Sequence, residues 1–462
     1  SGGGSFIVAS ENLGAGAGLA AAAALIVDYL LDVAVGIAAG VGALVSAVPR
    51  LQSHTVGLCL GILALLTLVN LRGVREAGAA FLLPTYLFVG CLLTVIGLGI
   101  VQTLMHGGHP VPVVAPPRAA APLEAASAWL LLRAFASGCT ALTGIEAVSN
   151  GVPMFRDPAR PNARRTLAVI GVLLAVLLAG IAYLIRAYGV MATAPGAPGY
   201  RSVLAMLTAA VAGTGWFYYL TIAAILAVLA LSANTAFAGF PLLCRMVAER
   251  GYLPGFFAMR GRRLVYTVGI LVLAGLAAAL LIAFGGITDR LIPLFAIGAF
   301  MAFTLSQAGM VVHWRRERGR GWRHKLAING AGAIVTGITV GVVLVAKFAE
   351  GAWITALLIP GLIWLMLRVR RQYDLVEHQT APAAFSLQRL QPPLAVVPIA
   401  TWNRATENAL RFAYMLSPDV HVVHIHCADD PKPAATEWHA SLMAATAQAG
   451  LATPQLAVLE SP

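Results

Sequence analysis

Long apolar runs separated by short polar connections dominate the first 370 residues of the chain. Each run can form a helix of about 20 residues, which is the length that crosses a hydrocarbon core of roughly 30 Å. Helices are expected because a chain in lipid must satisfy its own backbone hydrogen bonds. The ten predicted spans cover residues 15–47, 54–72, 78–105, 127–151, 163–188, 215–249, 264–286, 289–313, 325–348 and 351–369.

Basic residues orient these spans. With residue 1 on the cytoplasmic side, the connections on that side carry about twenty Lys and Arg against about seven opposite, as the positive-inside rule requires. The composition agrees, because 59% of the 462 residues are hydrophobic and 11% are charged, whereas soluble domains carry roughly 25% charged residues. The net charge of +12 does not indicate a nucleic-acid partner, since the arginines lie in short clusters between apolar runs.

The pattern changes after residue 370. Strand-like runs at 394–400, 420–427 and 455–459 alternate with helical patterns at 405–416 and 437–449, and this alternation predicts a parallel sheet. We therefore expect four parts, namely a cytoplasmic lead-in (1–14), an all-α transmembrane transporter domain (15–370), a linker (371–391) and a partial cytosolic α/β domain (392–462).

Acidic side chains inside the spans are the first candidates for function, because a charge at mid-depth costs about 2.5–3.5 kcal/mol on insertion scales. Asp28 and Asp32 are four residues apart, which places both carboxylates on one helix face, beside Tyr29. Two like charges would repel there, so at least one is expected to bind a cation or to stay protonated. Interhelical hydrogen bonds or a water-filled vestibule are the alternative explanation.

The fourth span carries Glu146 and a dense set of small and hydroxyl-bearing residues. Two glycines weaken a continuous helix there, and a broken helix frees carbonyl oxygens to replace the hydration shell of an ion. Ser137, Thr140 and Thr143 add hydroxyl groups to the same stretch. Close packing of small residues between helices is the alternative explanation.

Polar groups in other spans are secondary candidates. Asn234 and Thr235 lie in the sixth span and Gln307 in the eighth. Such groups form interhelical hydrogen bonds at least as often as they bind a ligand. Arg133 lies near the outer part of its span, where it would snorkel to the interface or pair with an acid.

The sequence predicts neither a metal site nor a cofactor. The five cysteines are scattered and match no disulfide or zinc spacing. His424 and His426 share one face of a predicted strand, whereas His421 and Cys427 point to the other, so a structural role is favoured for these residues. We expect a transport protein and not an enzyme.

Several motifs resemble a known superfamily. Residues 3–14 (GGSFIVASENLG) resemble the G-G-x-Y-x-V…E-x-x-G stretch of the amino acid–polyamine–organocation superfamily, with Phe6 in the place of the tyrosine. Within that superfamily, residues 137–144 (SGCTALTG) and 303–307 (FTLSQ) resemble the KimA-type potassium importers, relatives of the KUP family. The likeness covers nearly the whole chain, including the tail.

The resemblance implies a five-plus-five inverted-repeat transporter fold, in which the ten spans correspond to helices three to twelve. The chain starts with Ser1 and not Met, so we expect a piece of a longer protein that lacks the first two helices. The resemblance also implies potassium import by proton symport, a homodimer in the cell (inner) membrane with its tail in the cytoplasm, and inhibition by a cyclic dinucleotide at the cytosolic domain.

On the same basis, Asp28, Tyr29 and Thr143 would line the potassium pathway, and Glu146 would couple protons. Asp32 stands where the importers carry threonine, which leaves the stoichiometry open. An amino-acid or polyamine permease of the same superfamily is the alternative function, although Thr143 precedes Gly144 where such a permease would carry an aromatic gate. A sensor that signals through its tail is a third possibility.

Overall fold

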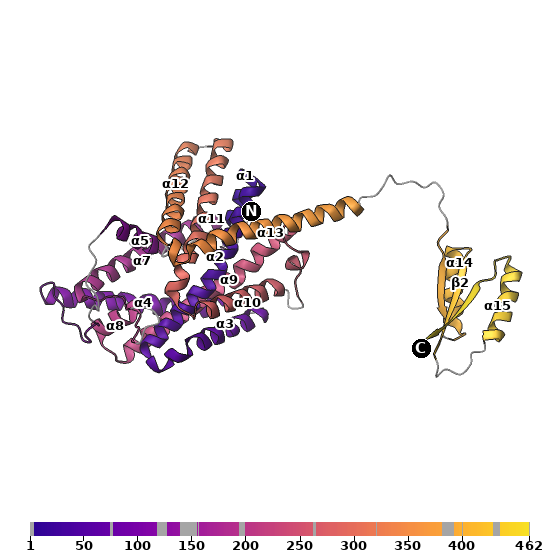
Figure 1. The fold of residues 1–462 in the computed structure, drawn as a ribbon, viewed down its shortest axis with the longest axis horizontal. Coiled ribbons are helices and arrows are strands. Elements are labelled where there is room, and N and C mark those ends of the chain that lie inside the picture. Colours follow the sequence, from indigo (N-terminus) through magenta and orange to yellow (C-terminus); the bar gives the residue numbers. More distant parts are fainter. Residues whose placement is uncertain are drawn as a thin grey trace. The chain divides into compact units, whose positions relative to one another are not determined.

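The computed structural model describes residues 4–73, 77–117, 127–138, 155, 157–193, 199–261, 265–319, 321–380, 392–399, 401–427 and 435–461. The chain divides into two compact units, residues 1–379 and 380–462, and each unit is described by itself (Figure 1). The described part of the first unit is built from helices, whereas the second combines helices with a sheet.

Eight helical segments in the described residues are long and apolar enough to cross a membrane, which makes this a multi-pass membrane protein. They confirm eight of the ten predicted spans. They are η1 with α3 (Pro49–His54 and Thr55–Leu71), α2 (Ala15–Ala47), α4 (Ala77–Met105), α7 (Ala159–Tyr188), α9 (Trp216–Glu249), α11 (Thr288–Glu317), α12 (Trp322–Ala346) and α13 (Ala352–Thr380).

The two remaining predicted spans correspond to shorter helices in the described residues. α10 (Thr267–Ala283) has 17 residues, fewer than the 264–286 that was predicted. It stops where Gly285 and Gly286 adopt φ values of 68° and 65°, a left-handed conformation that breaks a helix. α5 (Ala128–Gly138) forms the start of the predicted span 127–151, and the rest of that span lies outside the described residues.

α8 (Val203–Ala212) was not predicted and occupies a stretch that the sequence pattern left as a connection. Its ten residues extend only about 15 Å, too short to cross the lipid. It begins where the Ser202 side chain accepts a hydrogen bond from the Ala205 nitrogen, and it ends at Gly213, whose φ is 73°.

The predicted lead-in contains a helix of its own, α1 (Gly4–Leu13), which packs against α2 and α11. Phe6 is 1% exposed within this contact. Gly309 of α11 allows the approach, since a Cβ there would lie 3.0 Å from the Val8 carbonyl oxygen. Residues 4–13 are therefore part of the packed helical unit.

α2 is the centre of the first unit, and most of its side chains are buried. Its main partners are α9 and α11, which lie far from it in sequence and beside it in Figure 1. Small residues let these backbones approach closely, as is usual between helices in lipid. A Cβ on Gly36 would lie 3.1 Å from the Leu229 carbonyl oxygen of α9, and one on Gly298 of α11 would lie 2.9 Å from the Ala24 carbonyl oxygen.

The second unit confirms the predicted β-α-β-α-β order. β1 (Ala395–Ile399), β2 (Val420–Cys427) and β3 (Gln455–Ser461) pair in parallel in the order β1-β2-β3, with α14 (Arg404–Leu416) and α15 (Ala435–Ala449) as the connections. His424 is 8% exposed, and its Nδ1 lies 2.8 Å from the Ile399 carbonyl oxygen, which is a structural contact between neighbouring strands. Residues 371–380 of the predicted linker continue α13 as a helix.

Candidate functional site

α2 carries the two candidate acids and the tyrosine at the centre of the helix packing. Asp28 is 1% exposed, and its backbone lies against α11, because a Cβ on Gly298 would come within 3.2 Å of the Asp28 nitrogen. Tyr29 is 8% exposed and packs its ring on Gly239 of α9, where a Cβ would come within 2.7 Å of the ring. Asp32 is half-buried on the same face as Asp28. Gly298 therefore lets α11 approach the backbone of α2 at Asp28, and Gly239 leaves room for the Tyr29 ring.

An amide pair lies in the same layer of the packing. The Asn70 side chain of α3 donates a hydrogen bond to the Asn234 side chain of α9, with 2.6 Å between Nδ2 and Oδ1. The stretch of α2 from Tyr29 to Gly36 packs along α9 from Gly239 to Leu229, and Asn234 falls within that stretch. Polar groups from α2, α3 and α9 are therefore brought to one level of the unit.

Gln307 belongs to a different cluster, between α11 and α12. Its side chain packs on Gly332, where a Cβ would come within 3.2 Å, and its buried Oε1 has no hydrogen-bond donor among the described residues. Nearby, the Thr304 hydroxyl donates to the Thr336 hydroxyl at 2.9 Å. Gln307 lies nine residues along α11 from Gly298, a rise of about 14 Å, so the structure does not bring it together with the acids of α2.

The other candidates fall into two groups. Thr235 is exposed, and its hydroxyl donates to the Ser232 carbonyl oxygen at 2.7 Å, a bond within its own helix. Ser137 is half-buried near the end of α5. The remaining three, Thr140, Thr143 and Glu146, lie outside the described residues, as does the predicted break in the fourth span.

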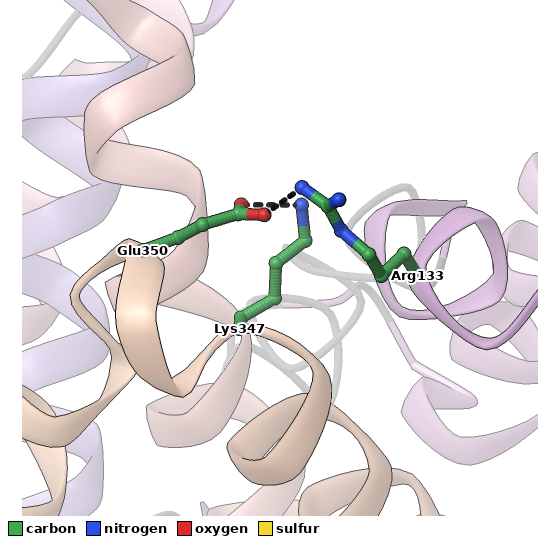
Figure 2. A network of polar contacts seen from close by, with 3 residues as sticks. All are labelled: Arg133, Lys347 and Glu350. Atoms are coloured by element: carbon green, nitrogen blue, oxygen red, sulfur yellow. Dashed lines mark hydrogen bonds and ion pairs between the residues drawn. The ribbon is translucent and has the colours of Figure 1, made fainter. Parts of the chain in front are cut away.

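Arg133 of α5 pairs with Glu350 in η5 (Phe348–Glu350), the turn between α12 and α13 (Figure 2). Lys347 holds the other oxygen of the same carboxylate, with 2.7 Å between Nζ and Oε2. Partial burial by itself would raise the pKa of Glu350, but the hydrogen bonds and charges of Lys347 and Arg133 outweigh it, and the pKa falls below its ordinary value. Of the two roles expected for Arg133, pairing with an acid is the one observed.

A small cavity opens at the C-terminal end of α2, which lies on the extracellular side in the predicted orientation. Its volume is about 240 Å³, and its lining includes Thr55, Tyr200 and Asp289. Burial and the nearby charge of Asp289 both raise the pKa of Tyr200. The cavity is thus lined by an acid and hydroxyl groups at one end of the helix that carries Asp28.

This arrangement suits a small cation or a proton. A carboxyl group buried near the midpoint of α2 is costly when charged, and a bound cation or a proton offsets that cost. Carboxylate, amide and hydroxyl oxygens can replace the water around a dehydrated ion. Asn70 was not singled out from the sequence, although an amide inside an apolar span is the same signal that identified Asn234.

Comparison with known proteins agrees with this geometry. Residues 1–365 match the family described as amino acid permease. The potassium transporter KimA of Bacillus subtilis (strain 168) is 37% identical over 424 residues, which cover 92% of this chain and 68% of that protein. The family match and the identity to this transporter both confirm the resemblance noted from the motifs. This chain belongs to the amino acid permease family.

Proposed function

We propose that this protein is a potassium transporter that couples uptake of the ion to protons. The observation that carries the proposal is the 37% identity to a potassium transporter over 92% of the chain. The burial of Asp28 and Tyr29 where α2 meets α11 and α9 supports it, because it places an acid and a hydroxyl inside the helix packing.

Asp28 is the proposed anionic ligand of the potassium pathway. An ion that sheds its water needs several oxygen ligands, and a buried carboxylate is tolerated when a cation neutralises it. The Tyr29 hydroxyl would stand beside it, and Ser137, Thr140 and Thr143 would supply further hydroxyl groups from the fourth span. The Asn70–Asn234 hydrogen bond would brace α3 against α9 at this level.

Proton coupling follows from the same electrostatics. Asp28 and Asp32 are one helical turn apart, so the charge on one raises the cost of charging the other. A potassium ion at one carboxylate and a proton on the other would neutralise the pair together, so the two ions would cross the membrane in the same direction. Glu146 is the proposed carboxyl group that passes the proton.

The assembly and its control are proposed by resemblance. The protein would be a homodimer, with the transporter domain at 15–370 and the cytosolic domain at 392–462 joined through 371–391. A cyclic dinucleotide would bind the cytosolic domain and inhibit uptake. The parallel β-α-β-α-β order of that domain supports a ligand-binding role, because loops at the carboxyl ends of parallel strands commonly form binding sites.

Uptake into proteoliposomes tests the proposal directly. The full-length protein should import potassium, and an inward proton gradient should accelerate the import. Absence of potassium uptake by folded, membrane-inserted protein would overturn the proposal. Potassium uptake that does not depend on the proton gradient would support potassium transport and contradict proton coupling.

An amino-acid or polyamine permease is the competing function, because the family as a whole is described as amino acid permease. Uptake of radiolabelled amino acids and polyamines by the same vesicles separates the two. Saturable uptake of either, with no potassium-dependent flux, would establish the competing function.

A further inference from the structure

A basic cavity lies between three helices of the first unit, away from the acids of α2. Its volume is about 1070 Å³, and its lining comes from the start of α7, the end of α11 and the start of α12. The charged and aromatic residues of this lining are Arg164, Arg165, His313, Trp314, Glu317 and Lys325.

The cavity carries a positive charge. Arg164, Arg165 and Lys325 face a single acid, Glu317, which already lies 3.3 Å from His313 Nε2 one turn away on α11. Arg164 and Arg165 come from α7 and Lys325 from α12, and all three side chains are exposed. Three cations against one acid suit an anion with several oxygens.

Trp314 contributes its indole ring to the lining. Its Nε1 is buried and has no acceptor among the described residues. Lys325 lies over the same ring, with Nζ 4.2 Å from the ring centroid. The ring therefore holds the ammonium group of Lys325 at the cavity.

The apolar surroundings of the cavity favour a lipid. Val169 and Val172 of α7 are each 66% exposed and lie four and seven residues beyond Arg165, about 6 to 10 Å along the helix. Ile328 of α12 is 58% exposed, three residues beyond Lys325. The positive-inside rule places the basic ends of all three helices on the cytoplasmic side, where the anionic lipid head groups lie.

The geometry points to a binding site for the phosphate head group of an anionic phospholipid in this cavity, with the acyl chains along the apolar faces of α7 and α12. The head group would bind Arg164, Arg165 and Lys325. The site is separate from the proposed ion pathway, and it does not depend on which substrate the protein carries.

Native mass spectrometry of the purified full-length protein tests the site. The protein is titrated with phosphatidylglycerol, phosphatidylcholine and inorganic phosphate in separate series. We expect tight binding of phosphatidylglycerol only. The variant R164Q/R165Q/K325Q should bind it roughly a hundredfold more weakly, at about one kcal/mol per removed cation and tenfold per 1.4 kcal/mol.

A matched variant, R72Q/R316Q/R371Q, removes three exposed arginines from the same predicted face outside the cavity. It should keep the affinity of the wild-type protein. Equal losses in the two triple variants would show a diffuse surface charge in place of a site and overturn the proposal. Equally tight binding of inorganic phosphate would also overturn it, because the acyl chains would then contribute nothing.

A variant that preserves charge separates binding from folding. R164K/R165K/K325R keeps all three cations and should retain most of the phosphatidylglycerol affinity, with an unchanged unfolding temperature. Failure of the charge-preserving variant to bind, with its fold intact, would contradict recognition through charge.

Discussion

The Asn70 side chain donates a hydrogen bond to Asn234 across 164 positions of sequence, with 2.6 Å between Nδ2 and Oδ1. The bond joins the end of α3 to the middle of α9, beside the stretch of α9 that packs on Tyr29. Hydrogen bonds between membrane helices contribute about 0.6 kcal/mol on average and up to about 1.7 kcal/mol. The pair is therefore expected to be a specific interhelical hydrogen bond that contributes modestly to stability at the level of the candidate site.

A double-mutant cycle measures the coupling free energy of this hydrogen bond. Asn70→Leu and Asn234→Leu should each lower the free energy of unfolding by about 1 kcal/mol, because each leaves one amide without its partner. The double variant should lose less than the sum of the two, with a coupling energy near 0.6 kcal/mol. Unfolding in detergent provides the measurement. Strictly additive effects would contradict the pairing, and Asn329→Leu, whose amide bonds the carbonyl of Lys325 in its own helix, should show no coupling to Asn70.

Asp28→Asn tests the proposed ion ligand. The amide keeps the shape of the side chain and removes its charge, so the fold should remain. Potassium uptake should fall at least about tenfold, because the loss of even 1.4 kcal/mol of ion binding has that effect. Initial rates in proteoliposomes over a range of potassium concentrations provide the measurement. Asp374→Asn, an exposed acid paired with Arg370 near the end of α13, is the control, and wild-type uptake in Asp28→Asn would remove this residue from the pathway.

Gly298→Ala tests the close contact between α2 and α11. The added Cβ would lie 2.9 Å from the Ala24 carbonyl oxygen, a backbone atom that cannot rotate away. Overpacking of this kind costs roughly 1–3 kcal/mol of stability and would move α11 away from Asp28. We expect a lower unfolding temperature and slower uptake. Gly341→Ala on α12 meets nothing within 4 Å and should be neutral or stabilising, so equal effects of the two variants would contradict the contact.

Glu350→Gln tests the outer ion pairs of Figure 2 through pH. The folded-state pKa of Glu350 lies below its ordinary value of 4.5, so its contribution to stability is complete above that value and is lost as the pH falls through the lowered pKa. The variant should be less stable than wild type near neutral pH by at most about 1 kcal/mol, since the groups are partly exposed. Thermal unfolding should show this difference disappearing in strong acid. A difference that persists there, or an equal effect of Glu11→Gln, would contradict the assignment.

Glu146→Gln tests the proposed route of the proton. The amide cannot titrate, so potassium uptake should lose its dependence on external pH while some uptake remains. Uptake rates measured over a series of pH values, at a fixed potassium gradient, provide the comparison. An unchanged pH profile would exclude Glu146 from coupling.

Much of the fold could be read from hydropathy because lipid and water impose opposite demands on a chain. The predicted spans at 15–47 and 215–249 agree closely with α2 and α9, since a backbone in lipid must be helical and the apolar run sets its length. The strands of the tail were predicted nearly to the residue. α8 was missed because ten apolar residues between a serine and a glycine give no signal of a span.

The candidate site was predicted only in part. Asp28 was identified because a charged residue inside an apolar run is costly, and such a residue can be recognised from the linear sequence alone. The sequence could not tell whether Asn70 or Gln307 belongs to the candidate site, because an amide costs less in lipid than a charge does. The role of an amide depends on its hydrogen-bond partner. The structure assigned Asn70 to Asn234 and Gln307 to a different cluster beside Gly332.

The amino-acid sequence alone predicted which segments are long and apolar enough to cross the membrane, how they are oriented under the positive-inside rule, and which side chains within them are polar. These features depend on how each segment interacts with lipid or water, and they do not depend on which other helices it contacts. Only the tertiary structure decided that Gly298 lies against the backbone at Asp28 and Gly239 against the ring of Tyr29, and that Arg164 and Lys325 line one cavity. Such contacts join residues far apart in the chain, and side-chain packing between helices selects them.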